Sequence, residues 1–138
     1  MDTNADTTVA LARGLAGYVR AVARELGLPA QGTSFEISDT ATAYLGLSTS
    51  WAQLPGRDLM LVWNERDGWS LSVETRPTED VFVIAQFGNE LLPSPSAVAR
   101  FVTSTLSGLA ASSRRLAPAR RTVDRGTLAT RLQQYIVD

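Results

Sequence analysis

The spacing of apolar residues changes twice along this chain, and that change restricts the possible folds more than any other feature. Near the N-terminus and again near residue 100, apolar residues recur at three- and four-residue steps, which is typical of a helix with one apolar face. Between residues 35 and 87 they recur mostly at every second position, which is typical of half-buried strands. The order of helix, strands and helix predicts an α+β fold.

The first helix is expected over residues 7–26. Its apolar face carries Val9, Leu11, Leu15, Tyr18, Val19, Val22 and Leu26. Gly27, with a proline two residues later, favours a stop at its C-terminus. Gly14 and Gly17 each cost a helix about 1 kcal/mol relative to alanine. We therefore expect them to permit the close approach of another backbone, that of the sheet.

Four antiparallel strands, or five, are expected after this helix. They are Phe35–Ile37, Ala41–Leu47, Leu59–Trp63, Trp69–Val73 and Val81–Phe87. Residues 48–57 are expected to form a loop because they are largely polar and contain the Pro55-Gly56 turn signal. Leu59–Trp63 is apolar at consecutive positions, as in a central strand covered on both faces. Covering the second face would require a second copy or the C-terminal tail.

The second helix is expected to begin after Ser94, with Pro95 at its first position, and to end at Gly108. Both helices should pack on one face of a four- to five-stranded antiparallel sheet, giving a two-layer sandwich over residues 1–110. Residues 111–138 are expected to form a basic linker and a short amphipathic tail helix. The apolar stripe of that helix consists of Leu128, Leu132, Tyr135 and Ile136. Because so short a helix is marginal alone, we expect it to pack on the sheet or on a second subunit.

Several kinds of catalytic chemistry are excluded by composition. The 138 residues include no histidine and no cysteine, and all 13 basic side chains are arginine. The chain therefore lacks the usual proton shuttle, the thiolate nucleophile and the Schiff-base lysine. The Glu65/Asp67 pair is interpreted as a solvated hairpin tip, and Glu36, Asp39 and Glu74 as unrelated surface carboxylates. We expect no enzymatic activity, no cofactor and no metal.

Charge is distributed unevenly along the chain. Residues 1–110 contain seven arginines against twelve acidic residues, a net charge of −5, whereas residues 111–138 carry six arginines against two aspartates, a net charge of +4. The tail arginines that could contact nucleic acid are Arg114, Arg115, Arg120 and Arg121. They lack interleaved aromatic residues, so the preferred interpretation is docking on an acidic protein surface.

Two functions from different classes remain open. The first is a protein-binding or assembly module that forms a homodimer and binds an unidentified protein. The residues expected to contact the partner are Trp51, Arg57, Trp69 and Tyr135, because aromatic and arginine side chains often anchor interfaces. Trp63 and Trp69 flank a hairpin, and core packing is the simplest interpretation of their large apolar area. The alternative is a small-molecule-binding or accessory protein of specialised metabolism. Its pocket would lie between helices and sheet and be lined by Tyr18, Tyr44, Trp63 and Phe101.

A cytoplasmic location is expected. No apolar run approaches the roughly 18–20 residues that span a bilayer. The first six residues, MDTNAD, are acidic, whereas a secretory signal begins with basic residues and continues with apolar ones. We therefore expect no membrane partner.

Residues 55–69, PGRDLMLVWNERDGW, form the most specific part of a resemblance. Together with Ala41–Leu47 and with Leu92–Pro95 leading into Val98–Val102, they resemble an uncharacterised actinobacterial family, a domain of unknown function. The resemblance spans about residues 10–109 and implies an actinobacterial cytosolic protein, without supplying an activity or a ligand. The helix–sheet–helix order is also similar to that of secretion chaperones, which dimerise and bind peptides.

Overall fold

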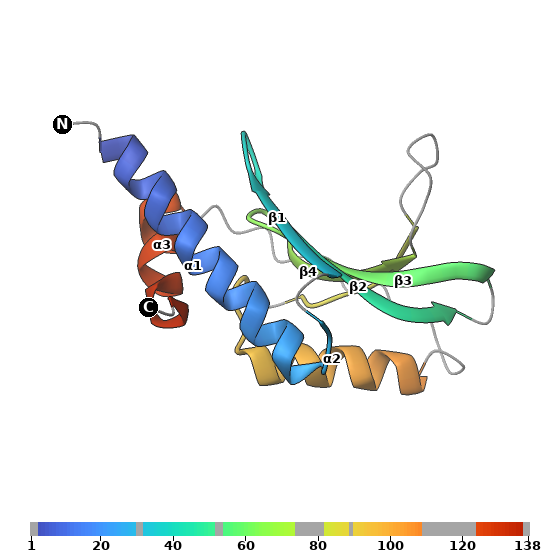
Figure 1. Ribbon diagram of the computed structural model, residues 1–138. Coiled ribbons are helices and arrows are strands. Elements are labelled where there is room, and N and C mark those ends of the chain that lie inside the picture. Colours follow the sequence, from blue (N-terminus) through green and yellow to red (C-terminus); the bar gives the residue numbers. More distant parts are fainter. Residues whose placement is uncertain are drawn as a thin grey trace.

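The protein folds into a single antiparallel sheet with helices before and after it (Figure 1). The computed structural model describes residues 3–29, 32–51, 54–73, 82–88, 90–108 and 124–136. The elements are α1 (Thr3–Glu25), β1 (Thr33–Ile37), β2 (Ala41–Trp51), β3 (Leu54–Asn64), β4 (Gly68–Val73), β5 (Phe82–Gln86), α2 (Pro95–Gly108), α3 (Arg125–Leu132) and the 3₁₀ turn η2 (Gln133–Tyr135).

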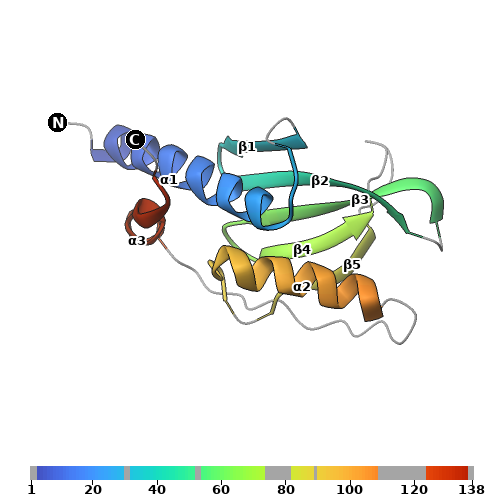
Figure 2. The same cartoon turned by 60° about the horizontal axis from the view of Figure 1, so that its bottom comes forward.

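The five strands lie in the order β1-β2-β3-β4-β5, so each pairs with its neighbours in sequence and β3 is central. All four pairings are antiparallel. Both α1 and α2 lie against the same face of the sheet (Figures 1 and 2). The predicted α+β architecture is confirmed, and the sheet has five strands, within the predicted four to five.

Alternation along β3 separates the two faces of the sheet. Leu59, Leu61 and Trp63 have between 0 and 1% of their surface exposed and face the helices. Met60 and Val62, at the intervening positions, are half-buried and point to the other side. No helix in the described part of the chain covers that side (Figure 1). The apolar run of β3 was expected to mark a strand covered on both faces; α3, the described part of the tail, does not cover this second face, and cover by a second copy stays a prediction.

The segment that was expected to be a loop, residues 48–57, belongs largely to a long hairpin. β2 continues to Trp51 and β3 begins at Leu54, and these two residues pair across it. The pairing shifts register around Ser50, which pairs with Asp58. Irregular pairing tolerates a proline near a strand end, so the Pro55-Gly56 signal did not stop β3.

The helix ends follow the capping residues in the sequence. Gly27 has a positive φ of 69°, and the next amide, that of Leu28, donates to the carbonyl of Ala23 at 2.8 Å, which closes α1. The hydroxyl of Ser94 accepts from the amide of Ala97 at 3.2 Å at the start of α2.

The tail helix α3 packs on α1 of the same chain (Figures 1 and 2). Leu128 and Leu132 are fully buried and join the main hydrophobic core. The expectation that this helix would pack on the sheet or on a second subunit is therefore wrong. The sheet face towards the helices is already occupied by α1 and α2, whereas the N-terminal half of α1 extends past the sheet and offers a second surface (Figure 2).

The two glycines of α1 receive this tail. A Cβ at Gly14 would lie 2.6 Å from the Cβ of Leu132, and one at Gly17 would overlap the carbonyl oxygen of Tyr135. The predicted close approach of another backbone is confirmed, but the approaching backbone belongs to α3 and η2. The spacing of Gly14 and Gly17 places both on one helix face.

Replacing Gly17 with alanine is expected to destabilise the fold by about 1–3 kcal/mol, because the added methyl group must displace η2. In an exposed helix the same change would add about 1 kcal/mol of stability. Gly126→Ala is the comparison variant, since its Cβ would meet only Oδ1 of Asp124, at 3.2 Å, instead of overlapping a backbone carbonyl. Urea denaturation should show a clear loss of stability for Gly17→Ala and a smaller change for Gly126→Ala. Equal stabilisation by both would contradict the observed contact.

Candidate functional site

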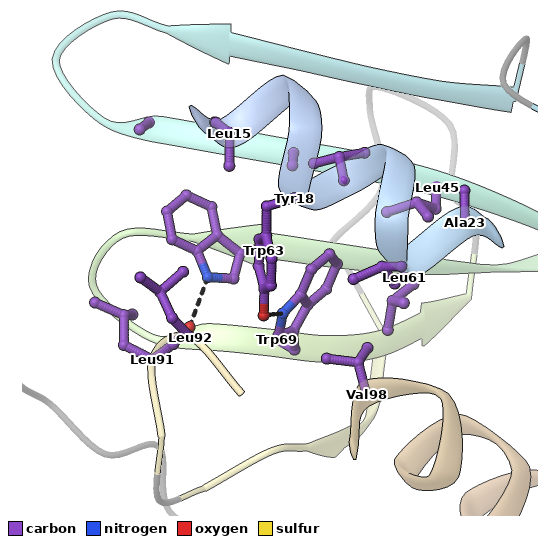
Figure 3. Close-up of a cluster of buried hydrophobic side chains, with 14 of the residues drawn as sticks. Leu15, Tyr18, Ala23, Leu45, Leu61, Trp63, Trp69, Leu91, Leu92 and Val98 are labelled. Carbon is purple, nitrogen blue, oxygen red and sulfur yellow. Dashed lines mark hydrogen bonds between the residues drawn. The ribbon is translucent and has the colours of Figure 1, made fainter. Parts of the chain in front are cut away.

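The centre of the core is a hydrogen-bonded aromatic cluster (Figure 3). The indole Nε1 of Trp69 donates to Tyr18 Oη at 3.0 Å, and Tyr18 Oη donates to the carbonyl of Pro93 at 2.5 Å. The indole Nε1 of Trp63 donates to the carbonyl of Leu91 at 2.8 Å. All three side chains are fully buried. They tie the segment before α2 to α1 and the sheet, so their polar atoms serve the fold.

Burial also changes the acidity of two tyrosines. Desolvation raises the pKa of Tyr18 far above its ordinary value, although its hydrogen bond with Trp69 opposes the shift. Partial burial raises the pKa of Tyr135 as well, and Arg131 opposes that shift. The two rings are in contact, with centroids 4.8 Å apart. Neither phenol is therefore set up to act as a base near neutral pH.

The four residues predicted to line a ligand pocket do not come together. Tyr18 and Trp63 are fully buried in the core. Phe101 packs edge-on against Phe87, with ring centroids 5.4 Å apart. Tyr44 alternates with the buried residues of β2 and therefore points to the opposite face of the sheet. The prediction that these four residues line one pocket is therefore wrong, because they lie on both sides of the sheet.

The four predicted partner contacts have different outcomes. Trp69 has none of its surface exposed, so the expectation that it touches a partner is wrong: its indole is needed inside. Tyr135 is half-buried against Tyr18. The side chains of Trp51 and Arg57 lie outside the described residues, and the arginines at 114, 115, 120 and 121 lie in a segment outside them. A partner role for these residues stays a prediction.

Two ion pairs hold α3 at its ends. Arg125 Nη2 lies 3.0 Å from Glu65 Oε1 and also donates to the carbonyl of Ser38 at 2.5 Å. Arg131 Nη2 lies 2.6 Å from Glu90 Oε1. Because the pairs are partly exposed, each contributes at most about 1 kcal/mol. Burial of Leu128 and Leu132, at roughly 1.5–3 kcal/mol each, provides most of the docking energy, and the arginines set orientation.

The hairpin carboxylates are engaged within the protein. Glu65 Oε1 accepts the amide of Ala41 at 2.8 Å in addition to Arg125, and Asp67 accepts from the side-chain amide of Asn64 at 3.3 Å. Across the described segments, no cluster of three or more aspartate or glutamate side chains is placed to hold a metal ion. Glu65 therefore has a structural explanation as the anchor of Arg125.

The face of the sheet turned away from the helices has an unusual composition. We call this side of the sheet the open face. Two rows of residues that pair across neighbouring strands cross its centre. The first row is Ser34, Tyr44, Val62, Ser70 and Gln86, and the second is Gly46, Met60, Ser72 and Val83. None of the nine carries a charge. The acidic residues Glu36 and Asp58 lie outside the two rows and are exposed. An uncharged centre with charges around it is typical of a protein interface.

Ser72 is a further feature of the open face. It is 1% exposed, and its Oγ has no hydrogen-bond partner among the described residues. A buried hydroxyl without a partner costs about 1–3 kcal/mol. It lies between Met60 and Val83, in the second row of the open face.

Comparison with known proteins gives a family but no activity. Residues 18–104 match the family of unknown function DUF6292. The chain belongs to this family. The matched segment contains the sheet, α2 up to Ser104 and the aromatic cluster, and it excludes α3 together with Gly14 and Gly17. Neither the search of curated proteins nor the search of solved structures found a match.

No helix among the described residues is long and apolar enough to cross a membrane.

The surface of α1 on which α3 packs was not predicted as the docking site of the tail, although the sequence carries one signal for it. Ala10, Gly14, Gly17 and Ala21 repeat at four-, three- and four-residue steps, which puts four small residues on one side of α1. Such a stripe indicates close helix packing, but it does not identify which segment packs there.

Proposed function

We propose that this DUF6292 protein is a non-catalytic protein-binding module that forms a homodimer through its open face. The observation that carries the proposal is the uncharged pair of rows on a sheet face that no described helix covers. A cytoplasmic location and an actinobacterial source belong to the same proposal, and both come from the sequence.

A second copy is the occupant that this surface favours. A two-fold interface brings each residue close to its own counterpart, so a charged centre would repel itself. The two rows of the open face contain no charge, and Met60 and Val62 supply apolar area at the central strand.

The test is the mass of the protein in solution. We expect two chains per particle at micromolar concentration by light scattering, and one chain for Val62→Asp, because a two-fold axis would bring the new carboxylates together. The free energy of unfolding of the monomeric Val62→Asp variant should differ by less than about 1 kcal/mol from that of a wild-type chain, since Val62 is half-buried at the surface.

Val9→Asp is the matched control. Val9 is 59% exposed on α1, on the other side of the sheet from the open face, and its substitution should leave a two-chain particle. A wild-type mass of one chain would refute the homodimer. A dimer that both variants retain would place the interface elsewhere.

A further inference from the structure

We propose that Tyr44 is the anchor residue of the open-face interface, and that Gly46 positions its ring. The inference rests on the proposed homodimer and deepens it, because it names the side chain through which the second copy is held. Of the nine residues in the two rows of the open face, Tyr44 is the only aromatic one. It lies on β2, next to the central strand β3, where it pairs with Val62 (Figure 2).

The side chain of Tyr44 lies along β2 instead of standing upright on the sheet. Residues two positions apart in a strand point to the same face and are about 7 Å apart. A Cβ built at Gly46 would nevertheless lie 3.5 Å from Tyr44 Oη and 3.8 Å from Tyr44 Cε1. The end of the ring must therefore lean over Gly46. The side chain is half-buried in this position, so part of the ring remains accessible on the open face.

The backbone conformation of Gly46 does not require a glycine, because its φ is outside the left-handed region. A glycine inside a strand weakens it and often marks a place where another group comes close. Here that group is the end of the Tyr44 ring. A methyl group at Gly46 would meet the ring at an ordinary contact distance, whereas a larger side chain would have to displace it. Gly46 therefore leaves the space that the ring occupies.

A ring held in this way suits an interface anchor. The residues that dominate binding energy are enriched in tyrosine and cluster near the centre of an interface. On β3, Val62 lies opposite Tyr44 and Met60 lies opposite Gly46, so the ring has apolar neighbours on the central strand. Because Gly46 already gives the ring its position, association immobilises it at a lower cost in conformational entropy.

The dissociation constant of the dimer, measured on full-length chains by sedimentation equilibrium, tests the anchor. We expect Tyr44→Ala to raise it at least about thirtyfold, as for a residue that dominates an interface. Tyr44→Phe keeps the ring and should change it less than about threefold. Phe35→Ala is the matched control and should keep the wild-type value. Phe35 is 41% exposed, but it pairs with the buried Ala43 and therefore lies on the helix side of the sheet.

A second pair of variants tests the positioning role of Gly46. Gly46→Ala should keep the wild-type dissociation constant, because its methyl group fits beside the ring. Gly46→Val should raise the constant about tenfold, because its additional methyl groups displace the ring. Valine also adds apolar area and favours a strand, so an interface that depended on apolar area alone would become stronger. Equal dissociation constants for the two variants would overturn the positioning role.

Failure of the anchor can be told apart from failure of the homodimer. A wild-type mass of one chain would refute both. If Val62→Asp separates the chains but Tyr44→Ala keeps the wild-type dissociation constant, the homodimer stands and the anchor is wrong. The same holds if Tyr44→Phe loses as much affinity as Tyr44→Ala, because the ring would then not be what binds.

Urea denaturation in the monomeric Val62→Asp background separates binding from folding. A Tyr44 ring that served only the fold would lower the free energy of unfolding when removed and leave the dissociation constant unchanged. If circular dichroism shows that Tyr44→Ala is unfolded, Gly46→Val decides, since it keeps the ring in the chain and changes only its position. An unchanged dissociation constant in Gly46→Val would then overturn the proposal.

Discussion

Leu132→Asp is expected to lower the free energy of unfolding by about 3 kcal/mol, because a carboxylate cannot remain in the site of a fully buried leucine and α3 must leave α1. Undocking also exposes Leu128, and each leucine contributes roughly 1.5–3 kcal/mol of burial. The conformational entropy that α3 gains when it leaves α1 offsets part of this loss of burial energy. Urea denaturation followed by tryptophan fluorescence and far-ultraviolet circular dichroism measures the loss.

Comparison with arginine variants tests which force holds α3. Deleting residues 111–138 should reproduce the loss caused by Leu132→Asp, whereas Arg120→Ala should cost much less, and Arg131→Ala no more than about 1 kcal/mol because its ion pair is partly exposed. If truncation leaves stability unchanged, α3 is not held on α1 in solution. If Arg131→Ala matches Leu132→Asp, charge rather than apolar burial dominates the docking.

The fold was predictable wherever periodicity and capping agree. Trp69, Leu71 and Val73 alternate as predicted and are fully buried, and Gly27 and Ser94 mark helix ends that the structure retains. The continuation of β2 to Trp51 and the start of β3 at Leu54 were not predicted, because residues 48–57 lack apolar alternation and contain Pro55. Pairing across an irregular register held that segment in the sheet, and such tertiary pairing leaves little local signal.

The site was less predictable, because packing assigns roles that residue type alone leaves open. Trp69 was interpreted as a partner contact, yet its indole donates to Tyr18, 51 positions earlier in the chain. Gly14 and Gly17 did indicate a close backbone, but no local pattern distinguishes a strand from α3 as the neighbour. Contacts between distant segments depend on the topology of the fold. Periodicity predicts the fold class, but it does not predict which distant segments pack together.

Alkaline pH should destabilise the protein through Tyr18. Burial raises its pKa in the folded state, so the folded protein holds the proton more tightly than the unfolded chain. The stabilisation is complete below the unfolded pKa of about 10 and is lost as pH rises above it, by at most about 1.4 kcal/mol per pH unit for one tyrosine. The chain has no lysine and no cysteine, so its three tyrosines are the only side chains expected to titrate between about pH 9 and 12.

Tyr18→Phe separates the acid–base effect from packing. At pH 7 it should cost about 1–3 kcal/mol, because the indole of Trp69 and the carbonyl of Pro93 both lose their partner. Above pH 10 its stability should fall less steeply than that of the wild type. Tyr135 is half-buried, and partial burial raises the pKa of its phenol. Tyr135→Phe should therefore leave most of the decrease of stability with pH in place. An unchanged slope in Tyr18→Phe would mean that this phenol is accessible to hydroxide in the folded state, in conflict with its burial against Trp69 and Tyr135.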